Sequence, residues 1–195
     1  MQQQVTLAPG QSQQVAFNVV PQATGVYQVN LDSLSGTFTV MGVEEQSLYT
    51  GWIGISQSPS FPRWGQKLTI PGRTITRLGI RLSRTPYTEG NITFTIRRAS
   101  DDSLLQSKVW GNVNLLPLHP SSILAEVIFD NPVLIAGEVY ILVENPNPQL
   151  VYLYGTNYDI KPGECMADYG WWPDEGRFRY SDNGKYDLAY RYTYI

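Results

Sequence analysis

The sequence predicts an all-β fold, an antiparallel β-sandwich or jelly roll. Short segments of alternating apolar and polar residues recur at intervals of roughly 8–12 residues, with turn residues between them. The chain carries 17 Gly and 13 Pro without a period, a composition typical of many turns between short strands. A helical pattern is almost absent. Only LLPLHPSSIL has room for one turn, and its two prolines limit it.

The region that follows Leu48 holds most of the expected strands. They are YTGWIGISQ, KLTI, TITRLGIRLS, NITFTIRRA, a strand around 107–113, ILAEVIFD, VYILVEN, LVYLYGTN and YDLAYRYTYI. Side chains alternate between the two faces of a strand, so one face of each should be apolar. The residues that this alternation places in the core are Leu78, Ile80, Leu82, Ile92, Phe94 and Ile96.

Charge divides the chain between about Gly42 and Leu48. Residues 1–31 carry no charged side chain, and all 14 Lys and Arg lie from Arg63 onward. Before the boundary, VTLAPGQSQQVAFNVVP and TGVYQVNLDSLSGTFTV predict alternating strands broken by Pro-Gly and Gly turns.

This opening resembles the C-terminal half of a CARDB-type immunoglobulin-like domain. The resemblance is carried by LAPGQSQQVAF, by GVYQVNLDSLSGTFTV and by the abrupt end at Val40. It implies a partial Ig-like segment at 1–42 without the earlier strands of such a domain. Half a sandwich exposes an apolar face and unpaired strand edges. Three arrangements stay open: the missing half was removed, another chain supplies it, or these strands pack on the second module.

Residues 48–195 resemble a jelly-roll β-sandwich module of large extracellular and phage-associated proteins. The matching segments are QKLTIPGRTITRLGIRL, ITFTIRRASDDSLL, VIFDNPVLIAGEVYILVE and FRYSDNGKYDLAYRYTY. The resemblance implies the fold. It implies no activity, because modules of this kind share none.

Composition argues against two classes of partner. A net charge of −3 and a pI near 5.1 are unlike the basic surface of a nucleic-acid-binding protein. No apolar run approaches the roughly 20 residues that span a membrane. The opening MQQQVTLAPGQSQQ also lacks the basic and apolar regions of a signal peptide, so we expect an exported protein to carry this chain as a mature fragment.

The residue types of catalysis are scarce, and we expect no enzyme and no catalytic residue. His119 is the single His, and its LPLHPSS context favours a loop residue over a general base. Cys165 is the single Cys, which excludes an internal disulfide and a His/Cys metal site. The distant alternative is a hydrolase with two C-terminal carboxylates about 5–10 Å apart, a separation that sequence spacing cannot show.

No cofactor is expected, and Ca²⁺ is the one metal ion for which the acidic residues offer candidate ligands. Asp182 and Asp187 are weak candidate ligands, because hard cations take carboxylate oxygens. SDNGKYD is not an EF-hand loop, however. A β-turn at Asp182-Asn183-Gly184 is the favoured interpretation.

The C-terminal aromatic residues are the best functional lead. Nine of the 13 Tyr lie between Tyr152 and Tyr194, together with the Trp171-Trp172 pair. Sugar rings stack on exposed Trp and Tyr faces, while neighbouring polar side chains bind their hydroxyls. The alternative is a small core within a long ordered loop. The predicted ligand-binding residues are Tyr169, Trp171, Trp172, Asp174, Arg177 and Tyr180.

The final segment YDLAYRYTYI predicts a strand with an aromatic face. Alternation places Leu188, Tyr190 and Tyr192 on the core side, and Asp187 with Arg191 toward solvent. If the strand is instead an edge, its aromatic residues would pair with a neighbouring subunit.

These features predict a non-catalytic extracellular binding or adhesion module, with carbohydrate as the favoured ligand. The alternative is a structural subunit of a surface layer, filament or virion, in which the N-terminal strands complete a neighbour's sheet. The expected partners are a glycan or neighbouring protein subunits, including copies of this chain. The expected location is extracellular or at a cell or virion surface.

Overall fold

Strands make up almost all of the regular structure, so the predicted all-β class is confirmed. The computed structural model describes residues 4–16, 18–31, 33–54, 63–86, 89–144, 151–172, 177–183 and 186–195; at 31, 53–54, 169–172 and 177–183 it describes the backbone alone. Within these residues there is no α-helix, and the only helical turn is the 3-10 helix η1 (Val113–Leu115). The chain divides into two compact units, 1–40 and 41–195.

The first unit contains a two-stranded antiparallel ribbon. Its strands are β1 (Gly25–Leu31) and β2 (Leu34–Val40), as the GVYQVNLDSLSGTFTV pattern predicted. The strands predicted earlier in this unit are wrong, because the described residues from Gln4 to Thr24 form no strand. A strand requires a neighbour for its backbone hydrogen bonds, and these residues pair with no strand in the described chain.

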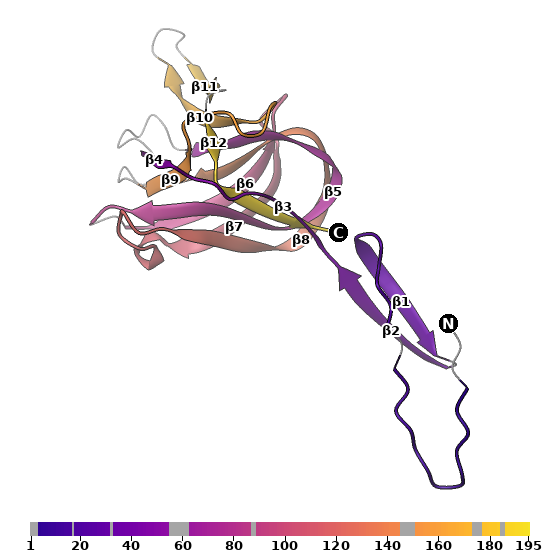
Figure 1. Cartoon of the computed structure of the whole chain (residues 1–195). Coiled ribbons are helices and arrows are strands. Elements are labelled where there is room, and N and C mark those ends of the chain that lie inside the picture. Colours follow the sequence, from indigo (N-terminus) through magenta and orange to yellow (C-terminus); the bar gives the residue numbers. More distant parts are fainter. Residues whose placement is uncertain are drawn as a thin grey trace. The chain divides into compact units, whose positions relative to one another are not determined.

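Two strands of 22 residues each, β5 (Arg63–Arg84) and β8 (Ile123–Glu144), run through the whole second unit (Figure 1). The sequence predicted two shorter strands in place of each. At Pro71-Gly72 the strand β5 does not end; its pairing with β8 shifts register between Ile70 and Arg73 and then continues. Gly72 has a φ of +66° there, and Gly137, opposite Ile70 on β8, has a φ of +95°. Both glycines allow the strands to bend without ending.

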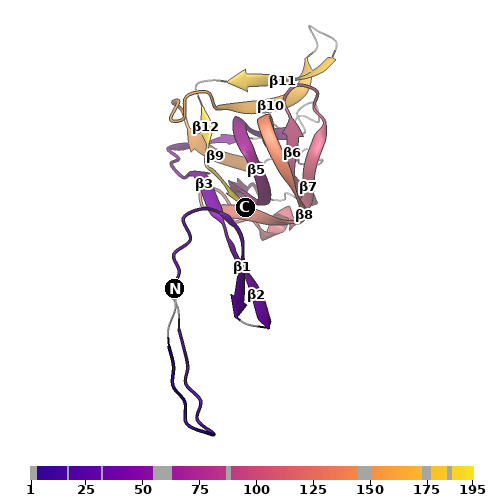
Figure 2. The same ribbon diagram turned by 90° about the vertical axis from the view of Figure 1, so that its right-hand side faces the viewer.

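Each of the long strands β5 and β8 contributes one half to each layer of the sandwich, and the first half of one pairs with the second half of the other. Residues 63–70 of β5 pair with 137–144 of β8, and residues 75–82 pair with 123–133. The first layer has the order β11–β10–β5–β8–β6–β7, and Figure 2 shows β5, β8, β6 and β7 side by side. Its other strands are β6 (Asn91–Arg98), β7 (Leu104–Asn112), β10 (Cys165–Trp172) and β11 (Arg177–Asn183).

The second layer adds the chain's last strand to the other half of β5. β13 (Tyr190–Tyr194) pairs with β5 on one side and with β3 (Gly42–Gln46) on the other. β9 (Val151–Thr156) pairs with the end of β5, with β4 (Gly51–Gly54) and with β12 (Asp187–Leu188). Since β13 has neighbours on both sides, the alternative of an edge strand is wrong.

The core lies between the two layers and confirms the predicted alternation. All six side chains that the sequence assigned to the core on β5 and β6 are fully buried. Leu188, Tyr190 and Tyr192 are also buried, as predicted for the last strand. Asp187 was expected to face solvent, and this prediction is wrong: its side chain is fully buried. The loop 157–164 and Gln66 of β5 cover this side of the strand and donate hydrogen bonds to the Asp187 carboxylate.

Candidate functional site

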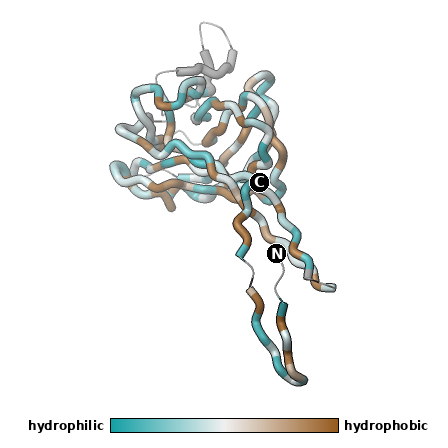
Figure 3. Tube along the Cα trace, turned by 45° about the vertical axis from the view of Figure 1, so that its right-hand side comes forward, coloured by the Kyte–Doolittle hydropathy of each residue, from teal (hydrophilic) through white to brown (hydrophobic). Residues whose placement is uncertain are grey.

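The first unit, which we call the arm, has no core of its own. None of the described residues from Gln4 to Val40 is buried. Apolar residues are nevertheless frequent along it (Figure 3). The most exposed are Val20 at 78%, Leu34 at 70%, and Val19 and Val26 at 63% each. A two-stranded ribbon is marginally stable by itself, and the described part of the arm leaves apolar side chains exposed.

Among the described residues of the arm, one pair of aromatic rings packs across the two strands. The rings of Tyr27 and Phe38 stack with centroids 5.3 Å apart. They occupy directly opposed positions of β1 and β2. The Tyr27 hydroxyl also donates a hydrogen bond to the carbonyl of Ala23 at 2.8 Å. These contacts hold the ribbon together and leave its strand edges and other apolar side chains exposed.

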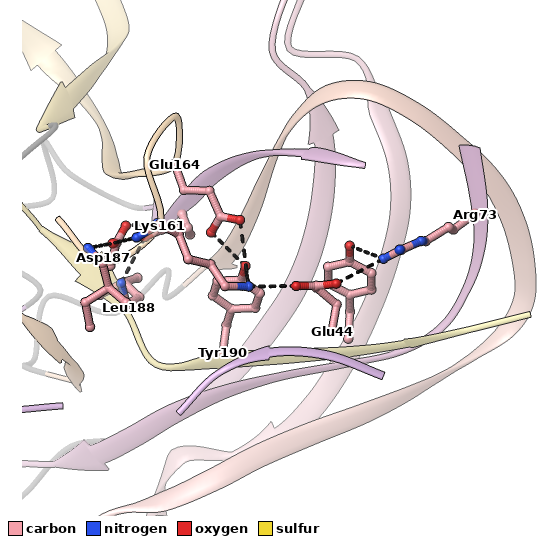
Figure 4. A network of polar contacts seen from close by, with 10 residues as sticks. Glu44, Arg73, Lys161, Glu164, Asp187, Leu188 and Tyr190 are labelled. Carbon is pink, nitrogen blue, oxygen red and sulfur yellow. Dashed lines mark hydrogen bonds and ion pairs between the residues drawn. The ribbon is translucent and has the colours of Figure 1, made fainter. Parts of the chain in front are cut away.

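The strand after the arm, β3, is held within the second unit by ion pairs as well as by strand pairing. Glu44 lies 2.8 Å from the ammonium of Lys161 and 3.3 Å from the guanidinium of Arg73. Glu45 forms a second pair with Arg191 at 2.8 Å. Figure 4 shows Glu44 between its two cationic partners. The hydrogen bond from Lys161 holds the pKa of Glu44 below its usual value.

Lys161 continues this network into the core. Its ammonium lies 3.1 Å from the hydroxyl of Tyr190, which in turn donates to Glu164 at 2.7 Å. Burial raises the pKa of both Glu164 and Tyr190. The polar groups of the network bind one another, an arrangement typical of a structural anchor. It joins β3 and the loop 157–164 to the last strand.

Asp187, one of the two predicted calcium candidates, is part of the same region (Figure 4). One carboxylate oxygen accepts the backbone N–H groups of Ile160 and Lys161 at 2.6 and 2.9 Å. The other accepts the side-chain amide of Gln66 at 2.7 Å. Among the described residues, no group of three or more His, Cys, Asp and Glu side chains is arranged to hold a metal ion.

The structure places the backbone of most predicted ligand residues on one hairpin. Tyr169, Trp171 and Trp172 lie on β10, and Arg177 and Tyr180 lie on β11. Tyr169 is directly opposite Tyr180, and Trp172 is opposite Arg177. Asp182 is also on β11, opposite Ala167. The side chains of these residues and the whole of Asp174 lie outside the described part of the structure. A sugar site at this hairpin therefore stays a prediction.

Sequence reasoning did not single out Glu44, Lys161 and Glu164 as a group. Glu44 and Lys161 are far apart in the chain, and neither lies in a recognisable motif. The pairing of β3 with β13 places Glu44, and the hydrogen bonds of Ile160 and Lys161 to Asp187 place the loop that carries Lys161 and Glu164.

The chain matches no protein-family model and no curated protein. The likeness of its two parts to a CARDB-type domain and to a jelly-roll module therefore stays a prediction. In the described residues, no helix has the length and apolar character that crossing a bilayer requires.

Proposed function

We propose that this chain is a structural subunit of a surface layer, filament or virion that assembles by strand complementation. The arm of one copy adds its strands to a sheet of a neighbouring copy and completes its own apolar packing there. The observation that carries this proposal is the arm itself, which displays apolar side chains and has no buried residue in its described part.

The lack of charge in the arm supports the same proposal. Residues 1–31 carry no charged side chain, so burying them against a partner requires no desolvation of an ion. Unpaired strand edges are normally protected by charged residues such as Lys, and this segment has none. An uncharged strand edge favours pairing with another chain.

A pair of matched leucines tests the proposal in the full chain. Leu34, in the arm, is 70% exposed, and Leu134, in β8, is 71% exposed. Both sites are open to solvent, so an Asp at either one should leave the second unit folded. We expect Leu34→Asp to reduce self-association, measured by size-exclusion chromatography with light scattering, and Leu134→Asp to leave it unchanged. Equal association of Leu34→Asp and the parent chain would count against the arm as the assembly element.

A further inference from the structure

A second cluster of aromatic side chains lies in the second unit, away from the hairpin that the sequence favoured. We call it the aromatic shelf: Tyr49, Trp52, His119, Tyr152 and Tyr154. Trp52 is 51% exposed, and its ring lies 4.6 Å from Tyr152 and 5.1 Å from His119, centroid to centroid. Tyr49 contacts Tyr154 edge to face at 5.7 Å. The shelf therefore presents Trp52, and to a lesser extent Tyr49 at 44% exposed, on a set of packed aromatic side chains.

The strands position these residues. Trp52 on β4 pairs directly with Tyr154 on β9, and Gly54 pairs with Tyr152. His119 comes from the segment between η1 and β8. The guanidinium of Arg81 lies 4.6 Å from the ring centre of Tyr49 and orients that ring by a cation–π contact.

A hydrogen-bond arrangement fixes the His119 ring. The Tyr154 hydroxyl has one hydrogen, which it donates to the carbonyl of Pro120 at 3.1 Å, and it then accepts from the Ser83 hydroxyl at 3.0 Å. Its 3.0 Å contact with Nδ1 of His119 is then a bond that the imidazole donates. In the neutral ring this leaves Nε2 as an acceptor, and within the described chain Nε2 forms no hydrogen bond.

The hollow beside the shelf suits a small neutral ligand in both its size and its lining. Its volume is about 280 Å³, near the lower limit of ligand pockets. Its lining residues are Tyr49, Thr50, Gly51, Trp52, His119, Pro120 and Tyr154, none of which is charged when His119 is neutral. An anionic ligand would find no charged partner in this lining, whereas an amphipathic neutral ring would find both stacking surface and polar atoms.

We propose that the aromatic shelf is a carbohydrate-binding site for one sugar ring. The apolar C–H face of a pyranose stacks on Trp52, and one of its hydroxyl groups donates to Nε2 of His119. The hydroxyl of Thr50 supplies a further polar contact at the rim. This site is independent of the arm and differs from the predicted hairpin site at Trp171 and Trp172.

The rival occupant is a proline-rich peptide, which also docks on exposed aromatic rings. Such peptides lie along extended grooves as polyproline helices and contact several rings in succession. The hollow here has a volume of only about 280 Å³, although two shelf rings, Trp52 at 51% and Tyr49 at 44%, are exposed. This size favours a single sugar ring over an extended peptide.

The test uses saturation-transfer difference NMR on the full chain with the methyl pyranosides of glucose, galactose, mannose and N-acetylglucosamine. We expect at least one of them to receive saturation at its ring C–H protons. Trp52→Leu keeps an apolar side chain in β4 and removes the platform, so the affinity should fall by about tenfold or more. Tyr158→Leu is the control, because Tyr158 is 50% exposed and lies outside the shelf. Circular dichroism checks that each variant is folded.

Two further measurements complete the design. His119→Phe keeps an aromatic ring and removes the Nε2 acceptor, and it should weaken binding while Trp52 remains. The double variant Trp171→Leu/Trp172→Leu should bind as the parent chain does. The proposal is overturned if no pyranoside receives saturation, if binding survives Trp52→Leu, if only the double variant loses binding, or if a proline-rich peptide binds through Trp52 and the sugars do not.

Discussion

At the scale of single residues, Asp187 accepts hydrogen bonds with both of its carboxylate oxygens. An Asn amide cannot do this, because one of its two polar groups is a donor. Gln66 donates to Asp187 and accepts the backbone N–H of Leu188 at 3.0 Å. In Asp187→Asn, the new amide can face either Gln66 or the Ile160 and Lys161 N–H groups. If Gln66 rotates to accommodate it, the N–H of Leu188 loses its acceptor.

We therefore expect Asp187→Asn to destabilise the second unit by about 1–3 kcal/mol, because a buried donor is left unsatisfied in either orientation. Urea unfolding of the full chain measures this. Asp130→Asn is the control: Asp130 has a 72% exposed side chain paired with Lys108, and its loss should change the free energy by less than about 0.5 kcal/mol. Similar effects for the two variants would contradict the role assigned to Asp187.

The contributions of Glu44 and Glu164 to the stability of the folded chain should change with pH in opposite directions. The pKa of Glu44 is lowered in the folded chain, so its contribution is present above the unfolded value near 4.5 and is lost as the pH falls through the folded pKa. The pKa of Glu164 is raised, so its contribution is present below that value and is lost as the pH rises through the folded pKa.

Relative to the parent chain, Glu44→Gln should be less stable at about pH 7, and the difference should shrink toward about pH 4. Glu164→Gln should gain stability relative to the parent as the pH rises over the same range, since the buried side chain no longer ionises and still accepts from Tyr190. Urea unfolding at both pH values checks this. If the stabilities of the two variants relative to the parent chain change with pH in the same direction, the pKa directions assigned to Glu44 and Glu164 are wrong.

At the scale of elements, the closest approach of two backbones tests the pairing of the long strands. A Cβ on Gly65 of β5 would overlap the backbone carbonyl of Ile141 on β8. Gly65 is paired on both sides, with Leu142 of β8 and Ala167 of β10, so the strand cannot shift aside. We expect Gly65→Ala to cost about 2 kcal/mol or more in thermal or urea unfolding. Gly51→Ala in β4 faces open space and should stay within about 0.5 kcal/mol of the parent chain.

Alternation predicted the apolar buried side chains of β6 and of residues 78–82 of β5 correctly, because side chains on a strand alternate between its two faces. The lengths of β5 and β8 were not predictable in the same way. Pro71-Gly72 and Asn131-Pro132 have the composition of turns, and only the register of the paired strands shows that both breaks are bends within continuous strands. Asp187 was missed for a related reason: its donors come from the loop 157–164 and from β5, which local periodicity does not contain.

At the scale of the whole molecule, the charge distribution predicted a boundary between about Gly42 and Leu48. The break falls after Val40, and β3 belongs to the second unit because it pairs with β13. The aromatic shelf had no signal in the sequence. Trp52 and His119 lie in separate segments, and the pairing of β4 with β9 places Trp52 opposite Tyr154, to which His119 bonds.

The measurement that tests assembly most directly is light scattering after size-exclusion chromatography on the full chain and on a chain that begins at Met41. The shorter chain keeps β3 and its ion pairs at Glu44 and Glu45, so it should fold. We predict that the full chain forms oligomers whose mass rises with concentration and that the shorter chain is a folded monomer. A full chain that remains monomeric at every concentration, or two chains that associate equally, would contradict the assignment of the arm as the assembly element.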